Sequence, residues 1–401
     1  MINLLGIVLI FLTIVTITRL KKPLYVALSA ATLVTALYFR LPLGEFLGTV
    51  TKSATSKQTI TFMFVLYILS YLQALLEDRN MLKKAEAAMT SLLNNRRLSL
   101  AIIPVIIGLL AAPGAVLMVA SIMKDGTEDH MSKEEMAFLS SWYRHVPESS
   151  LPTFTAVLLA VSISGVPMHT FLMTMAPFFL CIMIIPYFLY LRRIPKDTGV
   201  VSGNSKMHDF KEICMNLWPI ALVIILIIGF GMQTIHACLI STVALMLLGG
   251  YKVKETLIPM FRKAFRPSML TGMFCVLIFK DVVASTGAVN GLSALFENLP
   301  IPIILIFAII YFIGTMVSGA QTMASLILPA AMAALPHPAT TMLLMSVGHV
   351  ASQLCPTHIC LPLVADYFKV DLGDIFKLTI PTAAIALVCA FTIYGMWMVI
   401  L

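Results

Sequence analysis

Two matched histidine motifs hold the side chains best suited to chemistry in this chain. His145-Val146 is separated by five residues from Pro152-Thr153, and the same pattern recurs 204 residues later, at 349–357. Histidine accepts, donates or carries a proton near neutral pH. Each proline removes a backbone donor and disrupts a helix. The motifs therefore predict two places where polar side chains and unpaired backbone groups hold a small solute or a proton.

A second matched pair of segments lies upstream of the histidines. Residues 113–115 read Pro-Gly-Ala and residues 318–320 read Ser-Gly-Ala. Such small residues let a backbone approach a ligand closely. Because the displacement is about half of the 401 residues, the sequence predicts a chain built twice from one design. Membrane proteins with interrupted helices in corresponding halves bind solutes where the interruptions meet.

Composition indicates the setting of these motifs. Hydrophobic residues make up 59% of the chain, charged residues 11%, and the mean hydropathy is +0.96. Soluble domains contain about 25% charged residues. The sequence therefore predicts an all-α polytopic membrane protein whose partner is the lipid bilayer. The net charge of +8 is attributed to cytoplasmic loops, so no nucleic-acid partner is predicted. Seven scattered cysteines without a CxxC pair predict no metal site and no cofactor.

The apolar runs divide into ten spans and two shorter pairs of arms. Residues 98–125 and 301–334 each contain two arms of about 12 to 15 residues, too short to cross, which predicts re-entrant hairpins. The predicted spans are 3–19, 23–40, 59–77, 134–165 and 168–191, followed by 214–231, 235–250, 269–287, 338–366 and 377–401.

Charge distribution predicts the orientation. Most of the 27 Lys and Arg residues fall on one side of the predicted spans, which is therefore cytoplasmic. Both termini are then expected outside a cytoplasmic, or inner, membrane that the chain crosses many times. Five spans per half is an odd number, so the two repeats are expected to be inverted. Residues 192–211 form the cytoplasmic linker, and residues 41–57 are expected to form an interfacial helix on the outer side.

The two interrupted spans predict the binding chemistry. Unwound backbone at membrane depth is tolerated where it lines a cavity or is covered by protein. Amides at the starts of half-helices favour an anion, and carbonyls at their ends favour a cation. The predicted site therefore binds a small anionic solute together with a coupling H⁺ or Na⁺. It comprises Pro113, Gly114, Ala115, His145, Glu148, Ser149, Ser150, Thr153, Ser318, Gly319, Gln321, Thr322, His349, Ser352, Gln353 and Thr357.

Several of these polar residues have structural alternatives. Arg144 and Glu148 are four residues apart, so they either neutralise one another or contact the solute or coupling proton. The matched histidines either bind or stitch the helix breaks together. Lys280-Asp281 lies within a predicted span and is either a structural clamp or a coupling pair. A metal site built from Glu148, Cys355 and His358 is not predicted, because the spacing of metal motifs is absent.

Two matched sets of spans, each with a hairpin and a broken span, resemble the ion transporter superfamily of secondary carriers. That superfamily includes divalent-anion/sodium symporters, gluconate permeases and citrate carriers. Within it, the chain is most similar to a prokaryotic integral-membrane family of unassigned function. The resemblance covers nearly the whole chain and rests on architecture, because the symporters' Ser-Asn-Thr signatures are missing. Residues 318–322 and 149–150 are only loose counterparts.

The resemblance implies an elevator carrier that forms a homodimer. Residues 1–97 and 212–299 would form the scaffold, and residues 98–191 and 300–401 the mobile transport domain. The sequence thus predicts a secondary active transporter, not an enzyme, for a carboxylate-type solute. Glu148 and the two matched histidines are the predicted proton carriers. The alternatives are a cation/proton antiporter using Lys280, Asp281 and Glu148, an intramembrane enzyme, and a channel.

Overall fold

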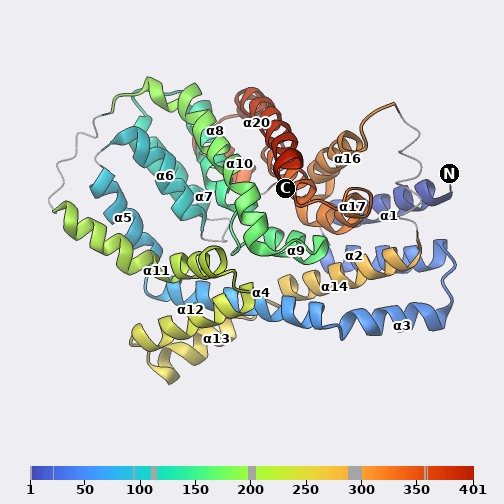
Figure 1. Ribbon diagram of the computed structural model, residues 1–401. Coiled ribbons are helices and arrows are strands. Elements are labelled where there is room, and N and C mark those ends of the chain that lie inside the picture. The colour runs from blue at the N-terminus through green and yellow to red at the C-terminus, as the bar shows by residue number, and fades with distance from the viewer. Residues whose placement is uncertain are drawn as a thin grey trace.

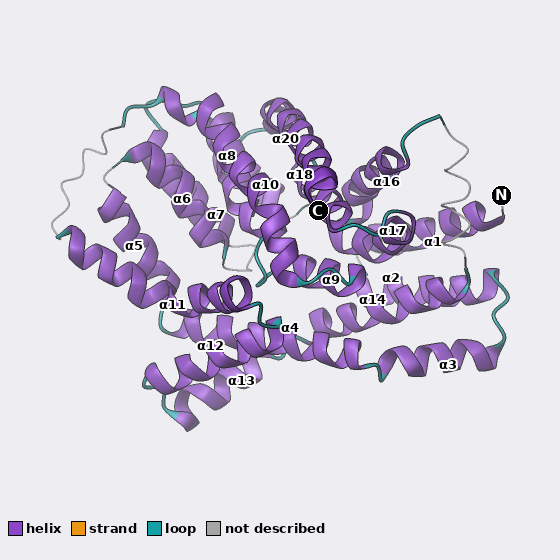
Figure 2. Cartoon of the chain, in the orientation of Figure 1, coloured by secondary structure: helices purple, strands orange, loops and turns teal. Residues whose placement is uncertain are grey.

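The computed structural model describes residues 2–20, 22–93, 95–109, 115–196, 205–287, 300–355, 358 and 360–401. Throughout these residues the protein is all-α, as predicted (Figures 1 and 2). Five stretches are helical, long enough and apolar enough to cross a bilayer: Lys57–Asp78, Met168–Leu189, Lys206–Phe230, Val253–Ser285 and Leu372–Ile400. Together with the composition, they make this a multi-pass membrane protein.

The helices of the first half follow the predicted spans closely. A helix occupies each of the five spans, and the span predicted over 134–165 is interrupted. The helices are α1 (Ile2–Arg19), α2 (Leu24–Tyr38), α3 (Leu43–Ala54), α4 (Lys57–Asp78), α5 (Met81–Leu93), α6 (Arg96–Gly108), α7 (Ala115–Thr127), α8 (Lys133–His145), a 3-10 turn (Val146–Ser149), α9 (Thr155–Ser164) and α10 (Met168–Leu189), with a second 3-10 turn at Leu191–Arg193.

The described helices of the second half follow the same order. The span predicted over 338–366 is also interrupted, after Gln353. The helices are α11 (Lys206–Phe230), α12 (Thr234–Leu248), a π-helical turn (Val253–Leu257), α13 (Ile258–Ala264), α14 (Pro267–Ser285), α16 (Ile303–Ser318), α17 (Ala320–Ala334), α18 (Pro338–Gln353), α19 (Cys360–Phe368) and α20 (Leu372–Ile400).

Several helix contacts between the two halves occur in matched pairs, in which each helix is replaced by its counterpart from the other half. α8 begins at Lys133 and α18 at Pro338, which is 205 residues later. α2 packs on α14, and their counterparts α12 and α4 pack on each other. In the same way α7 contacts α19 while α17 contacts α9, and α8 contacts α20 while α18 contacts α10. Corresponding helices of the two halves thus occupy corresponding positions.

Both interrupted spans lie in the centre of the molecule. Every residue of α8 from Met136 to His145 is buried, as are nearly all residues of α18. A helix that is buried on all faces belongs to the core rather than to a surface. α8 contacts α6, α7, α19 and α20, and the Trp142 indole donates a hydrogen bond to the Ile182 carbonyl at 2.9 Å. The breaks are therefore held in position by surrounding helices (Figure 1).

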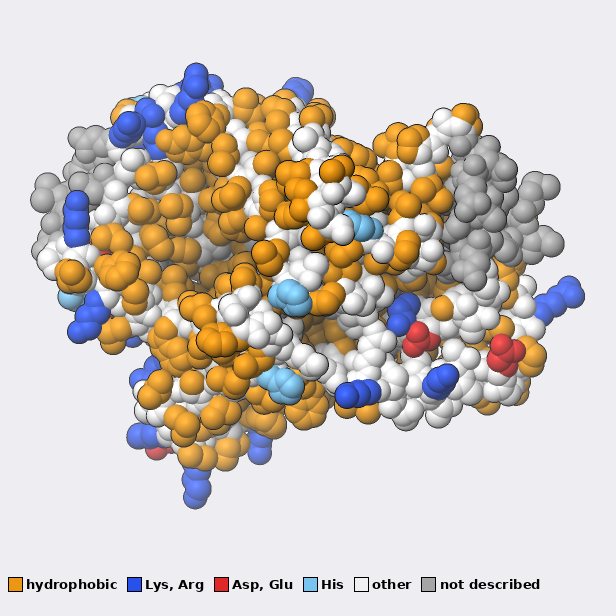
Figure 3. Space-filling view, viewed as in Figure 1, with side chains coloured by type: hydrophobic (Ala, Val, Ile, Leu, Met, Phe, Trp, Pro, Cys, Tyr) orange, Lys and Arg blue, Asp and Glu red, His pale blue; other side chains and the backbone are white. Residues whose placement is uncertain are grey.

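Three helices in the described residues, α3, α5 and α13, lie outside both the predicted spans and the predicted hairpins. α5 buries Met81, Leu82, Ala85 and Ala88, whose spacing puts them on one face, and it packs against α11. The lysines between these residues mask the helical period, and no span was predicted there. α3 lies within the predicted interfacial segment and packs on α14, and α13 packs in the corresponding way on α4. On the face drawn in Figure 3, hydrophobic side chains cover the middle and most Lys and Arg side chains gather towards the edges.

Candidate functional site

A pair of histidines joins the two helix breaks. His145, the last residue of α8, and His358, between α18 and α19, place their Nε2 atoms 2.8 Å apart. His145 Nδ1 lies 2.5 Å from the Ser141 carbonyl, which can only accept, so this nitrogen is the donor. In the neutral ring the lone pair is then on Nε2, facing His358. The Cys360 thiol completes a group whose possible ligand atoms all lie within 4.8 Å of one another.

An ion pair lies beside the histidines. Arg144 and Glu148 form the salt bridge that the four-residue spacing allows. The Arg144 side chain is only 3% exposed, whereas that of Glu148 is 31% exposed. A buried charge is tolerated when it is paired, because its desolvation cost is then offset. The pair therefore lets a guanidinium occupy the core next to the first break.

The serines of the breaks bond to nearby backbone and to each other. Ser149 Oγ is 3.2 Å from Ser150 Oγ and 3.4 Å from the Val146 carbonyl, and both serines are buried. In the second half, Ser352 donates to the Gly348 carbonyl at 2.8 Å. Hydroxyls of this kind satisfy backbone groups that a broken helix leaves unpaired. These interactions support a stitching role for the predicted serines.

His349 has different surroundings from His145, although the repeat matches them. Its ring is buried between Trp142 and Phe178, with centroid distances of 6.1 and 6.3 Å in edge-on geometry. Among the residues that the structure describes, its Nε2 has no hydrogen-bond partner. The histidine that meets His145 is thus His358, which the sequence-based site omitted.

A cavity of about 180 Å³ opens where the start of α9 faces α4 and α14. Phe154 occupies the position before α9 and makes no side-chain cap, so amides of the first helical turn are left for another partner. The Thr153 hydroxyl is buried and has no hydrogen-bond partner among the described residues. The lining residues are Leu66, Leu69, Ser70, Gln73, Thr153, Phe154, Thr155, Arg266, Met269 and Gln321.

Arg266 gives this cavity a positive charge. It stands immediately before α14 and is the one charged residue among those that line the cavity. Within the described part of the chain, no carboxylate forms an ion pair with it. Gln321, from the start of α17, adds a side-chain amide to the lining. A guanidinium, hydroxyls, amides and a helix N-terminus are together the groups that bind an anion.

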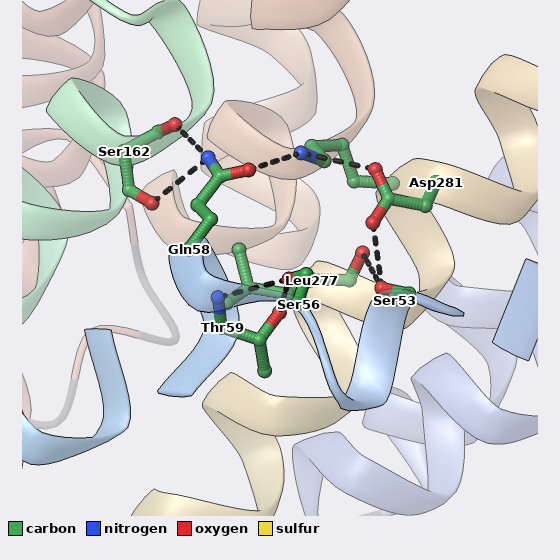
Figure 4. A network of polar contacts seen from close by, with 8 residues as sticks. Ser53, Ser56, Gln58, Thr59, Ser162, Leu277 and Asp281 are labelled. Carbon is green, nitrogen blue, oxygen red and sulfur yellow. Dashed lines mark hydrogen bonds and ion pairs between the residues drawn. The ribbon is translucent and has the colours of Figure 1, made fainter. Parts of the chain in front are cut away.

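The Lys280-Asp281 pair belongs to a different polar network, shown in Figure 4. Lys280 Nζ is 3.0 Å from Asp281 Oδ1 and 3.5 Å from Gln58 Oε1. Asp281 Oδ2 accepts from the Ser53 hydroxyl at 2.6 Å. Gln58 also donates to the carbonyl and hydroxyl of Ser162, at the end of α9. The network thus connects α14 and α4 to α9, the second half of the first broken span.

A larger cavity of about 610 Å³ borders this network. It is lined by three segments that are distant in sequence: the first turns of α4, the region from α9 to the start of α10, and the turn between α11 and α12. Gln58 and Ser162 are among its lining residues, together with His169 and Gln233. The cavity is therefore mixed in character, because polar residues and apolar residues such as Phe62 both line it.

The structure places the predicted site residues in several different environments. Pro113, Gly114 and Thr357 lie outside the described residues. Thr153 and Gln321 line the smaller cavity, whereas His145 and Glu148 lie in the histidine and ion-pair cluster. The others lie in or at the ends of helices: Ala115 begins α7, Ser318 ends α16, Gly319 precedes α17 with φ +86°, Thr322 is buried in α17, and Gln353 is buried at the end of α18. The sequence-based site missed His358, Cys360, Arg266 and Gln73.

Comparison with known proteins identifies the family. The family described as "Protein of unknown function (DUF401)" matches residues 4–397, so the chain belongs to that family. No curated protein matches the chain. Among solved structures it is similar to the YdaH transporter of Alcanivorax borkumensis, reported to have an unusual topology. The identity is 14%, the TM-score is 0.45, and the match covers 88% of this chain and 87% of that one.

Proposed function

We propose that this member of the DUF401 family is a secondary active transporter for a small anionic solute of the carboxylate type. It would move the solute across the cytoplasmic membrane, coupled to H⁺ or Na⁺. The observation that carries the proposal is the cavity of about 180 Å³. Arg266, Thr153 and Thr155, at the uncapped start of α9, line one space there, and no acidic residue is among its lining residues.

The size of the cavity favours a small solute. A water molecule occupies about 30 Å³ of liquid, so the cavity has room for about six. Pockets for drug-sized ligands begin at about 300 Å³. A carboxylate of a few carbon atoms fits this space, with its charge at Arg266 and its carbon atoms against Leu66, Leu69 and Met269.

The exchange of contacts between the halves supports an inverted repeat. It is the pattern expected of two copies related by a pseudo-two-fold axis, and the predicted odd number of spans places that axis in the membrane plane. We propose residues 1–97 and 212–299 as the scaffold, and 98–191 and 300–401 as the transport domain. The cavity lies between them, since α4 and α14 come from the first group and α9 and α17 from the second. The homodimer stays a prediction.

The larger cavity supplies an approach for the solute. Its lining segments, near residues 57–65, 158–169 and 231–235, fall at the ends of predicted spans that charge places outside. It shares α4 with the smaller cavity, where Val65 lines the one and Leu66 the other. We propose that it is the outer vestibule and that movement of α9 along α4 exposes the site.

The first experiment measures the thermal stability of detergent-purified protein with a panel of small anions. Each anion is tested in sodium and in potassium and at two pH values. A ligand at 100 times its Kd adds about 2.7 kcal/mol to the free energy of unfolding. We expect one carboxylate to stabilise the protein, and Arg266→Gln to abolish that stabilisation. Arg262→Gln, a change at an exposed arginine outside the cavity, is the matched control and should retain it.

Transport is then measured in proteoliposomes by counterflow of the labelled anion. Saturable counterflow distinguishes a carrier from a channel. Thr153→Val, which keeps the shape of the side chain but removes the hydroxyl, should raise KM. If every anion is inert while cations or pH alone change the stability, the solute proposal is wrong and a cation/proton antiporter is favoured.

Glu148 is the proposed carrier of a coupling proton. Its carboxylate is partly exposed at the first break and pairs with a buried arginine, so its protonation would release that pair. We expect Glu148→Gln to remove the pH dependence of transport while leaving binding of the anion measurable. Unchanged pH dependence would exclude this role for Glu148.

A further inference from the structure

Two imidazoles and one thiol converge from the two halves of the chain. His145 ends the buried helix α8, His358 lies in the second break, and Cys360 begins α19. The possible ligand atoms of these residues are all within 4.8 Å of one another. His145 and Cys360 are buried, and His358 is partly exposed. None of the three residues lines either cavity described above.

We propose that His145, His358 and Cys360 bind a resident transition-metal ion, with Zn²⁺ as the probe for the site. Two imidazole nitrogens and a thiolate are ligands that zinc prefers, and three protein ligands leave a fourth position for water. The ion would connect the two helix breaks. This inference does not depend on the identity of the transported solute.

The hydrogen bonding of His145 favours metal binding. Zinc-bound histidines usually donate their second N–H to a carbonyl or carboxylate, which fixes the tautomer. His145 does this through Nδ1 to the Ser141 carbonyl, which leaves the lone pair of Nε2 directed at His358. Trp142 and Tyr143, both fully buried in α8, hold that helix in place.

The two histidines require only a small adjustment. Zn–N bonds of about 2.05 Å at a tetrahedral angle put two ligand nitrogens about 3.3 Å apart. The two Nε2 atoms are 2.8 Å apart, so the rings would separate by about half an ångström. The competing interpretation is a simple hydrogen bond between two neutral imidazoles, which needs neither a metal nor the thiol.

The neighbouring charges are compatible with a cation. Arg144 precedes His145 in the chain, but its charge is balanced by Glu148 in the salt bridge. The Cys360 thiolate would add one negative charge next to the ion. Binding requires this thiol to lose its proton, and the metal itself drives that loss. The ion, the thiolate and the neutral ion pair together carry one net positive charge, so the thiolate halves the charge that the ion brings into the site.

The test measures metal bound to the purified full-length protein. The protein is stripped with a chelator, incubated with Zn²⁺, freed from excess metal and analysed for zinc. We expect one zinc per chain for the wild type. His358→Ala and Cys360→Ser should lower the affinity at least tenfold. Cys355→Ser is the matched control, because Cys355 is also buried at the second break but its thiol donates to the Met316 carbonyl at 3.1 Å; it should retain one zinc.

A second measurement does not depend on how well the variants fold. Wild-type protein loaded with Co²⁺ should show the thiolate-to-cobalt charge-transfer absorption that only a sulfur ligand produces. Wild-type protein without stoichiometric zinc would overturn the proposal. Full zinc affinity in Cys360→Ser, or a cobalt spectrum without the thiolate band, would overturn it as well.

Discussion

The two helix breaks share a sequence pattern but have different chemistry. The first contains the Arg144–Glu148 ion pair and a histidine that hydrogen-bonds across the molecule. In the second, the positions 204 residues later are Gly348 and Ser352, and the matched His349 lies between aromatic rings. The comparison shows that a repeat conserves where a helix is interrupted without conserving what the interruption does. The first break holds the Arg144–Glu148 ion pair. The second break packs His349 between aromatic rings and supplies His358 as the partner of His145.

The largest expected effect comes from removing the charge of the first break. Glu148→Ala takes the carboxylate away from a buried guanidinium and should lower the free energy of unfolding by about 3 kcal/mol. Ser352→Ala, the matched change in the second break, removes one local hydrogen bond and should cost about 1 kcal/mol or less. Thermal unfolding in detergent measures both. Equal losses would mean that the breaks are energetically equivalent.

The two histidines should differ next. His145→Leu removes the hydrogen bonds to Ser141 and His358, so a loss of about 2 kcal/mol is expected. His349→Leu replaces a ring whose Nε2 has no partner in the described residues, and it should be nearly neutral. Unfolding of the two variants under one set of conditions tests this. A larger loss for His349→Leu would reverse the comparison.

Packing of the second break depends on Gly348. A Cβ atom at this position would lie 2.6 Å from Cε1 of Tyr311, which is fully buried in α16. Gly348→Ala should therefore cost about 1 to 2 kcal/mol through overpacking. Gly373→Ala in α20 meets no atom within 4 Å and should be neutral or stabilising. A harmless Gly348→Ala would show that the contact between α16 and α18 is loose.

The smallest effect on stability is expected at Gln58. Gln58→Leu removes the hydrogen bonds to Ser162 and Lys280, and because these groups are near the surface it should cost about 1 kcal/mol or less. Under the proposed mechanism α9 moves along α4, so the same variant should change the transport rate more than it changes stability. An unchanged rate would indicate that this contact persists throughout the cycle.

The fold was largely predictable because its signals are long and local. Apolar runs of bilayer length identified the spans, and prolines marked both interruptions. Helix α5 was not predicted, because Lys83 and Lys84 interrupt its apolar period. Its buried face nevertheless packs on α11. For an amphipathic helix that packs on a neighbour, local hydrophobicity is a weak signal.

The candidate site was less predictable because its groups come from distant segments. Arg266 precedes α14 and carries the charge typical of a cytoplasmic loop, yet it lines a cavity with Thr153. His358 corresponds to Phe154 when the halves are displaced by 204 residues, so the repeat offers no signal for it. Likewise, Cys360 meets His145 only through the tertiary fold. Spacing along the chain cannot reveal such a group.

The unequal lengths of the helices have a consequence for the surrounding lipid. α2 and α12 each have 15 residues, a length of about 22 Å, whereas α20 has 29 residues and reaches about 44 Å. The hydrocarbon core of a bilayer is about 30 Å thick. We expect the bilayer to thin next to the two short helices and α20 to tilt so that its apolar length is buried. The helices therefore differ from the bilayer in apolar length, and the transport rate should vary with the acyl-chain length of the membrane lipids.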